Sequence, residues 1–131
     1  MHPLTPGRQG HAEQTIGEAH TAAALGSGSL PVLGTPALLA LMEAAAVDAL
    51  APSLPPETTS VGIYVELHHL AASPVGMAVR AEATLTAVEG RTLTFEIVAY
   101  DAQEMIGKAL HRRVLVDRER FMRRVEGKTT S

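Results

Sequence analysis

The chain has 131 residues and a mass of 13.8 kDa, which predicts one compact domain over residues 1–131. Hydrophobic residues make up 46% and charged residues 19%, a globular composition that excludes a disordered chain and a coiled coil. The net charge of −3 makes nucleic acid an unexpected partner, and the lack of cysteine excludes disulfides, thiol catalysis and Cys-ligated metal sites.

The N-terminal segment MHPLTPGRQG lacks the apolar stretch of a signal peptide, so we expect a cytoplasmic protein. This end, up to about residue 10, and residues 127–131 are predicted to be mobile. A weak strand is predicted between Ala12 and Ala24. The Gly-Ser-Gly-Ser run at 26–29 lacks both the lysine of a phosphate-binding loop and a preceding buried strand, so it predicts no nucleotide site.

A helix is predicted over residues 36–50, within the most apolar stretch of the chain. Thr35 and Pro36 are typical of a helix start, because a threonine hydroxyl can cap free amides and proline loses no hydrogen bond at the first helical position. Alanine, leucine and methionine propagate the helix, and Pro52 ends it.

This helix is expected to be buried rather than to cross a membrane. Glu43 and Asp48 interrupt its apolar run, which is shorter than the ~20 residues of a membrane span, so no membrane partner is expected. Nearly every face is apolar, so a curved sheet must cover one side and a further element the other. A homodimer is the simplest cover for the outer side, which carries the small residues Ala37, Ala40 and Ala44.

Alternating hydrophobic residues after the helix predict four antiparallel strands joined by short turns, including a tight hairpin at Glu89 and Gly90. Together with the helix they predict an α+β fold in which one antiparallel sheet covers a central helix. The basic run at 111–113 is more often a solvated strand face than a binding site, although an arginine near a cleft would suit phosphates. The predicted strands span residues 61–69, 77–88, 92–99 and 105–116, and a short charged helix follows at 117–125.

The first predicted strand ends in two histidines that point to opposite faces. His68, with Gly62, is expected on the outer face, and His69 on the face toward the helix, where a satisfied core histidine is its ordinary interpretation. Adjacent histidines on opposite faces cannot share one ion, and no third ligand has suitable spacing, so no metal site is expected. The predicted helix-facing set is Val61, Ile63, Val65, Leu67 and His69.

Glu43 is the most informative residue, because Leu39 and Val47, four residues to either side, place it on an apolar helical stripe. A buried carboxylate is unfavourable, and perturbed acids cluster at active sites. A structural partner or a route to solvent explains such a residue as well, and both interpretations stay open. His69 favours the functional one, since two ionisable groups then converge in the same helix–sheet layer.

Thr35 is either a helix cap or a catalytic donor. At a helix start, the amides of Ala37 and Leu38 and the positive end of the dipole can receive a developing oxyanion. Thr35 and Glu43 lie ~12 Å apart along the helix axis and ~80° around it, so they cannot touch unless a substrate lies between them. We therefore hypothesise a catalytic centre that uses groups from two protomers.

Four segments carry a further signal: VLGTPALLALMEAAAVDALAP, SVGIYVELHHLAASPVGM, VEGRTLTFEIVAYD and IGKALHRRVLVDRERF. Their most specific features are the threonine at the helix start, the glutamate eight residues on, and the pattern V-G-x-x-V-x-x-x-H followed by x-A-A-[ST]-P-x-G. From about residue 15 to residue 121, the chain resembles the hotdog-fold acyl-CoA thioesterases of the fluoroacetyl-CoA thioesterase type.

The resemblance implies a hotdog fold, a homodimer with sites near its interface, and hydrolysis of an acyl-CoA thioester without a cofactor. In that family a threonine, a glutamate and a histidine form the catalytic set, which falls here on Thr35, Glu43 and His69. Glu43 would be the nucleophile or the base for water, His69 the proton carrier and Thr35 the orienting donor. A pocket glycine and an active-site arginine fall on Gly62 and Arg113, which are predicted to bind substrate.

One segment departs from the family. Its members carry phenylalanines before the catalytic threonine that form a lid over the acyl group, whereas this chain has Gly-Ser-Gly-Ser at 26–29. The difference predicts a short or small acyl group other than fluoroacetyl. The alternative function is a non-catalytic acyl-CoA or small-ligand binding protein, because a fold does not fix a function.

Overall fold

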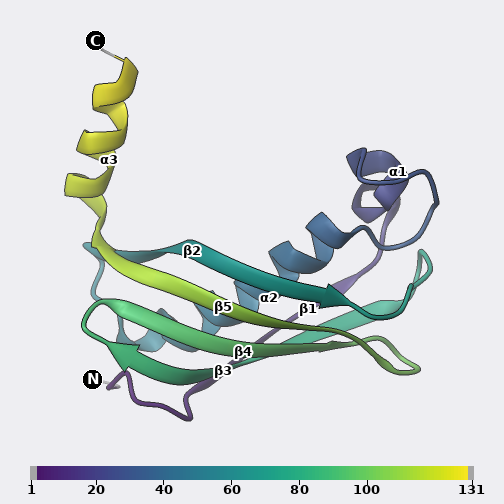
Figure 1. Cartoon of the computed structure of the whole chain (residues 1–131), viewed down its shortest axis with the longest axis horizontal. Coiled ribbons are helices and arrows are strands. Elements are labelled where there is room, and N and C mark those ends of the chain that lie inside the picture. Colours follow the sequence, from purple (N-terminus) through teal and green to yellow (C-terminus); the bar gives the residue numbers. More distant parts are fainter. Residues whose placement is uncertain (1–2, 130–131) are drawn as a thin grey trace.

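The structure, a computed structural model, describes residues 3–129 and consists of a curled antiparallel sheet lying against one long helix (Figure 1). The elements are β1 Gln9–Thr15, η1 Glu18–His20, α1 Ala22–Leu25, α2 Thr35–Leu50, η2 Ala51–Ser53, β2 Thr58–His69, β3 Ala78–Glu89, β4 Thr92–Tyr100, β5 Met105–Asp117, α3 Arg118–Glu126 and η3 Gly127–Thr129. The strand order is β1-β3-β4-β5-β2, so β1 and β2 are the sheet edges. The four strands predicted after the helix and both predicted helices are confirmed, each within three residues of its expected bounds.

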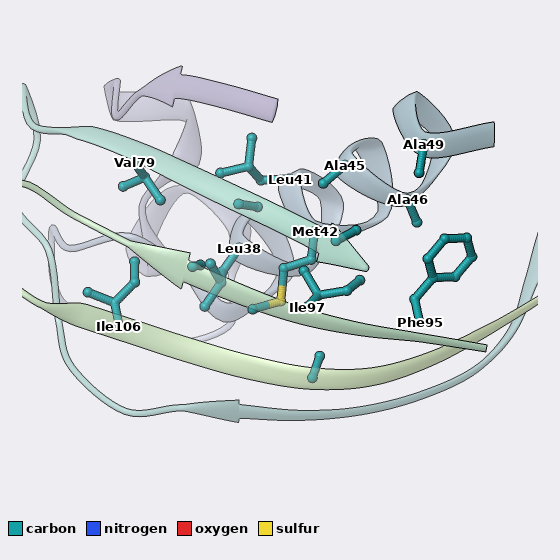
Figure 2. Close-up of a cluster of buried hydrophobic side chains, with 14 of the residues drawn as sticks. Leu38, Leu41, Met42, Ala45, Ala46, Ala49, Val79, Phe95, Ile97 and Ile106 are labelled. Carbon is teal, nitrogen blue, oxygen red and sulfur yellow. The ribbon is translucent and has the colours of Figure 1, made fainter. Parts of the chain in front are cut away.

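The hydrophobic core lies between α2 and the sheet (Figure 2). Residues 35–53 are long and apolar enough to cross a membrane by length and composition, and 39% of this stretch is buried inside the structure. Alternate residues of the central strands face the helix, as the sequence predicts. The buried side chains of β3 and β4 are Val79, Ala81, Ala83, Leu85, Leu93, Phe95, Ile97 and Ala99.

β1 crosses α2 so closely that Gly10 leaves no room for a side chain. A Cβ atom there would lie 2.3 Å from the backbone nitrogen of Ala49 and 2.4 Å from the carbonyl oxygen of Ala45. One turn of the helix also holds the strand, since the His11 amide donates to Oδ2 of Asp48 at 2.9 Å. These contacts fix α2 against one edge of the sheet.

The N-terminal region differs from the prediction. The weak strand expected between residues 12 and 24 ends at Thr15, and residues 22–25 form α1, whose cap is the Thr21 hydroxyl accepting from the Ala24 amide. Strand pairing begins before residue 10, because the Gly7 amide donates to Leu85, so this part of the expected mobile end is held by hydrogen bonds. Residues 127–129 form η3, and residues 1–2 and 130–131 lie outside the described chain.

The start of α2 also differs. The helix begins at Thr35, and the capping residue is Gly34, whose carbonyl accepts the amides of Ala37 and Leu38 at 3.1 Å each. The predicted capping role of the Thr35 hydroxyl is therefore wrong. The two amides expected to receive an oxyanion are also already bonded within the helix.

A bulge in β2 corrects the predicted faces of this strand. Gly62 pairs with Arg113 and Tyr64 pairs with Arg112, so Ile63 is an extra residue in the ladder. The bulge reverses the alternation on its N-terminal side: Gly62 faces α2, whereas Ile63, predicted to be buried, is 55% exposed. Beyond the bulge, the expected faces are confirmed for His69, which is partly buried, and for His68, which is exposed.

Candidate active site

Thr35 and His69 meet where α2 begins and β2 ends. The Thr35 hydroxyl oxygen lies 2.9 Å from Nδ1 of His69, within hydrogen-bonding distance. The hydroxyl is free for this contact because Gly34, rather than Thr35, caps the helix. Both residues line a hollow of about 370 Å³, whose other walls are formed by Ala22, Ser27, Val32, Leu33, Gly34, Leu70, Ala71 and Ala72.

Two features of His69 suit a proton acceptor. Burial lowers the pKa of its imidazole, and a weaker backbone interaction with Ala71 opposes that effect. Nε2 is shielded from solvent and has no hydrogen-bond partner within residues 3–129. A ring nitrogen that is buried, unpaired and beside an open hollow can exchange a proton with a bound molecule.

Glu43 lies two helical turns further along α2, in a second polar cluster. Its Oε2 atom lies 3.3 Å from Nη1 of Arg113 and 3.9 Å from Nε2 of His111, and its side chain is 41% exposed. The carboxylate fits here because β2 has a glycine at this point: a Cβ on Gly62 would lie 2.9 Å from Oε2. The bulge in β2 therefore brings the predicted Gly62 and Arg113 to Glu43.

Arg113 is held by hydrogen bonds along its whole guanidinium group. Nε donates to the Ser60 hydroxyl at 2.8 Å and Nη2 to the Ser60 carbonyl at 3.1 Å. Nη1 lies between Glu43 and Nε2 of His111, which is 3.1 Å away. Because these contacts engage the donors of a side chain that is only 8% exposed, the geometry suits a residue that positions Glu43. Direct substrate binding by Arg113 stays a prediction.

His111 helps to hold the Arg113 guanidinium group in place. Its Nδ1 lies 2.8 Å from the Tyr64 carbonyl, which can only accept, so Nδ1 carries the proton and Nε2 accepts from Arg113. Burial is the largest cause of the lowered pKa of His111, and the charge of Arg113 acts in the same direction. The prediction that residues 111–113 form a solvated face is therefore wrong for His111 and Arg113, which are 2% and 7% exposed.

The predicted site residues thus form two clusters in one chain. Thr35 contacts His69, and Glu43 lies with Gly62 and Arg113. Within residues 3–129, no hydrogen bond or ion pair joins Glu43 to His69, and Glu43 does not line the hollow beside Thr35. The shared crevice expected for Glu43 and His69 is therefore not formed inside a single chain.

Sequence reasoning missed His111 and Ser60 as partners of the site. Alternation along β5 from Ala109 carried a usable signal, because it puts His111 and Arg113 on the same buried face. Ser60 gave no signal of its own, since its contact with Arg113 depends on the pairing of β2 with β5. In the described part of the chain, no three His, Cys, Asp or Glu side chains gather as metal ligands would.

Solved structures identify the class of fold. A hot-dog-like protein from Thermanaerovibrio acidaminovorans is 25% identical with a TM-score of 0.86, covering 96% of this chain and 93% of that one. A Thermus thermophilus hypothetical protein, described as a thioesterase superfamily member, is 27% identical with a TM-score of 0.87, covering 98% and 97%. The predicted hotdog fold is confirmed, and its class is the hotdog thioesterases.

The family within that class is also defined. The model of the FlK family, fluoroacetyl-CoA-specific thioesterase, matches residues 16–119, and the chain belongs to this family. The fluoroacetyl-CoA thioesterase of Streptantibioticus cattleyicolor is 39% identical over 98 residues, which are 75% of this chain and 70% of that protein. A crystal structure of the fluoroacetyl-CoA thioesterase FlK is 31% identical with a TM-score of 0.90, covering 97% and 98%.

Proposed function

We propose that this protein hydrolyses a small acyl-CoA thioester to the free acid and coenzyme A. The observation that carries the proposal is the hydrogen-bonded Thr35–His69 pair, which opens on a hollow large enough for a small acyl group. Membership of a thioesterase family supplies the class of reaction. A related FlK mutant, 31% identical with a TM-score of 0.85, has been solved with fluoroacetate and coenzyme A bound.

The chemistry needs few groups, because a thiolate with a conjugate-acid pKa of about 8.5 leaves readily. Water supplies the oxygen that ends on the acyl carbon, the carbon–sulfur bond breaks, and one proton passes to the sulfur. His69 carries that proton, and the Thr35 hydroxyl orients the imidazole or donates to the carbonyl oxygen. Glu43 acts either as the nucleophile or as the base that activates water.

The Thr35 amide is the best placed backbone donor for the oxyanion. Pro36 has no N–H, and the next two amides donate to the Gly34 carbonyl. No acceptor within residues 3–129 pairs with the Thr35 N–H. Its location at a helix start, beside the hollow, suits an amide that receives negative charge.

The lining of the hollow supports a small acyl group without particular selectivity for fluoroacetyl. Ala22 and Ser27 form its wall on the side of α1 and the loop that follows, and no phenylalanine or tyrosine among the described residues lines it. The short Gly-Ser-Gly-Ser segment therefore leaves the acyl group without an aromatic cover. We expect discrimination among small acyl groups to be weak here, because a pocket of small side chains rejects few isosteres.

We also propose that the active unit is a homodimer paired through β2. This strand is a sheet edge with unpaired backbone groups, and its middle exposes Ile63, Tyr64 and Val65 at 55%, 42% and 38%. Beside it, the uncovered side of α2 exposes Ala44 and 47% of Val47. Pairing of two copies would cover both surfaces.

Such a dimer would also join the two polar clusters. Within one chain, Glu43 lies beside Gly62, seven residues and ~23 Å along β2 from His69. Antiparallel pairing centred between Ile63 and Tyr64 sets Gly62 of the partner subunit opposite Val65, which is only four residues, or ~13 Å, from His69. We propose that Glu43 of one copy completes the Thr35–His69 pair of the other.

The test is thiol release from a panel of short acyl-CoA esters. The wild type should turn over at least one of them, and Glu43→Gln should lose ~10³-fold in kcat while keeping its circular dichroism spectrum and dimeric mass. Glu57→Gln, at an exposed carboxylate just before β2, is the matched control. Tight binding of the esters by the wild type with no turnover would overturn the proposal and favour the non-catalytic binding protein.

A further inference from the structure

A second hollow, of about 260 Å³, lies between α3 and the turn that joins β3 to β4. Three arginines line it, Arg91 from the turn and Arg120 and Arg124 from α3, one helical turn apart. Phe121 supplies an aromatic wall between them. Neither Arg120 nor Arg124 forms an ion pair within residues 3–129. The carboxylate of Asp117 also lines the hollow, where it accepts the backbone amide of Arg120, so the lining has three positive charges and one negative charge.

The surrounding segment has the opposite charge to the rest of the protein. Residues 117–128 hold five Lys or Arg against three Asp or Glu, a net charge of +2, whereas the whole chain has −3. The other arginines of α3 are engaged elsewhere: Arg118 donates to the Pro56 carbonyl, and Arg123 pairs with Glu119 at 3.3 Å. Arg120 and Arg124 are thus the cations left to meet a ligand.

We infer that this hollow binds the phosphate groups of the coenzyme A half of the substrate, with the adenine beside Phe121. The inference rests on the proposed function, which supplies a substrate with three phosphate groups. Guanidinium groups match phosphate oxygens in paired hydrogen bonds, and an aromatic ring offers a face on which a base stacks. Three arginines around one ring therefore suit a phosphorylated nucleotide better than an acyl chain.

The distance between this hollow and His69 implies that the hollow binds the substrate that reacts at the Thr35–His69 pair of the other copy. In one chain, Thr58 pairs with the last residue of β5 and α3 follows at once, so the arginines lie a full β2 length, ~36 Å, from His69. The pantetheine arm spans only ~20 Å, like five or six extended residues. In Figure 1, α3 stands out beyond β2 at the opposite end from α1. Antiparallel pairing through β2 would bring Thr58 of the partner subunit, and the α3 beside it, next to His69.

The first experiment compares two substrates that share the acyl group. The double variant Arg120→Ala/Arg124→Ala should raise KM for the acyl-CoA ester by about 10- to 100-fold and leave kcat nearly unchanged. With the acyl-pantetheine thioester, which lacks all phosphates, the variant and the wild type should have the same kcat/KM. Arg118→Ala/Arg123→Ala removes the same charge from the other side of α3 and should change neither substrate's KM by more than about twofold.

The outcomes separate this inference from the proposed function. If the wild type hydrolyses neither substrate, the proposed function fails. If the wild type hydrolyses both substrates, two results would show that the hollow does not bind the phosphates. In the first, the arginine variant keeps the wild-type KM for acyl-CoA; in the second, its kcat/KM falls equally with both substrates. An equal rise in KM for the control variant would mean that overall charge, rather than this hollow, attracts coenzyme A.

A mixed dimer tests whether the arginines act across the interface. One copy carries His69→Ala with an intact α3, and the other carries Arg120→Ala/Arg124→Ala with an intact Thr35–His69 pair. Two affinity tags allow the heterodimer alone to be purified. The heterodimer should show the low KM of the wild type, because its one intact Thr35–His69 pair lies beside the intact α3 of the other copy. The high KM of the arginine variant in this heterodimer would contradict binding in trans.

Discussion

The two polar clusters beside α2 are built in different ways. The Thr35–His69 pair has one hydrogen bond between its members, an imidazole nitrogen without a partner, and an open hollow beside it. The Glu43 cluster is nearly saturated, since Arg113 donates to Ser60 twice and also contacts His111 and Glu43. The first cluster has unused bonding capacity, and the second uses its capacity to hold one carboxylate in place.

In the proposed mechanism, this difference separates reacting groups from positioning groups. Atoms that exchange protons need a free lone pair and access to the substrate, whereas a positioning group must be held in one conformation by its contacts. We therefore expect substitutions in the Thr35–His69 pair to lower activity without lowering stability. Substitutions around Arg113 should lower both.

The largest expected effect is at the imidazole. His69→Ala should lower kcat by ~10³-fold, and Thr35→Ala by ~10²-fold, because the pair acts as a unit. The double variant should be no worse than His69→Ala alone, which steady-state kinetics on all three variants would measure. Additive losses would mean that Thr35 and His69 act independently and do not form one reacting unit.

Arg113→Met should affect both activity and stability. It leaves Glu43, Nε2 of His111 and the Ser60 hydroxyl without their partner, so the free energy of unfolding should fall by about 2 kcal/mol. Loss of the fixed carboxylate should lower kcat by ~10²-fold. Urea unfolding and kinetics measure the two effects, and Arg112→Met, at a partly exposed neighbour stacked on Tyr64, is the control. Unchanged stability would contradict the network described here.

A pair of glycines sharpens the comparison. Gly62→Ala brings a methyl group to 2.9 Å from the half-exposed carboxylate of Glu43 and to 3.1 Å from Cε1 of His111. Because this contact displaces the carboxylate, kcat should fall about tenfold, with about 1 kcal/mol of lost stability. Gly10→Ala meets the rigid backbone of α2 at 2.3 Å and should lose about 3 kcal/mol. Thermal unfolding and kinetics on both proteins would show whether the two effects separate in this way.

The smallest expected effect is a pH dependence of stability. Burial lowers the pKa of both His69 and His111 from 6.5, so below that pH the unfolded chain binds more protons than the folded one. The free energy of unfolding should therefore decrease as the pH falls below about 6.5 and should gain nothing from these groups above it. His111→Asn should flatten this decline in urea titrations at pH 7.5 and 5.5. An unchanged slope would mean that carboxylates alone cause it.

Most of the fold was predictable from local patterns. β3 and β4 alternate regularly, and the alanine- and leucine-rich run between Thr35 and Pro52 has clear start and stop signals. The bulge at Ile63 was missed, because the register of β2 against β5 creates it. Gly62 was its sequence signal, since an isolated glycine inside a strand often marks a bulge or a close approach of another group. One extra residue was enough to turn Gly62 toward Glu43 of α2.

The site was predictable in its residue types and only partly in its partners. Alternation placed His69 correctly because it lies beyond the bulge. For the Thr35 hydroxyl, local patterns left two possible uses, a helix cap and a catalytic donor, and the tertiary contact with His69 decided between them. Glu43 was expected beside His69, and instead Arg113 lies next to it. A single chain cannot supply the missing contact, since the two residues lie beside opposite parts of β2.

The central claim is that a second copy brings Glu43 to the Thr35–His69 pair, and a purified heterodimer tests it most directly. One copy carries His69→Ala and the other Glu43→Gln, each inactive as a homodimer. If the site is shared, the heterodimer contains one complete site of two and should hydrolyse acyl-CoA at about half the wild-type rate per dimer. Activity no higher than that of the two inactive homodimers would contradict a site shared between subunits.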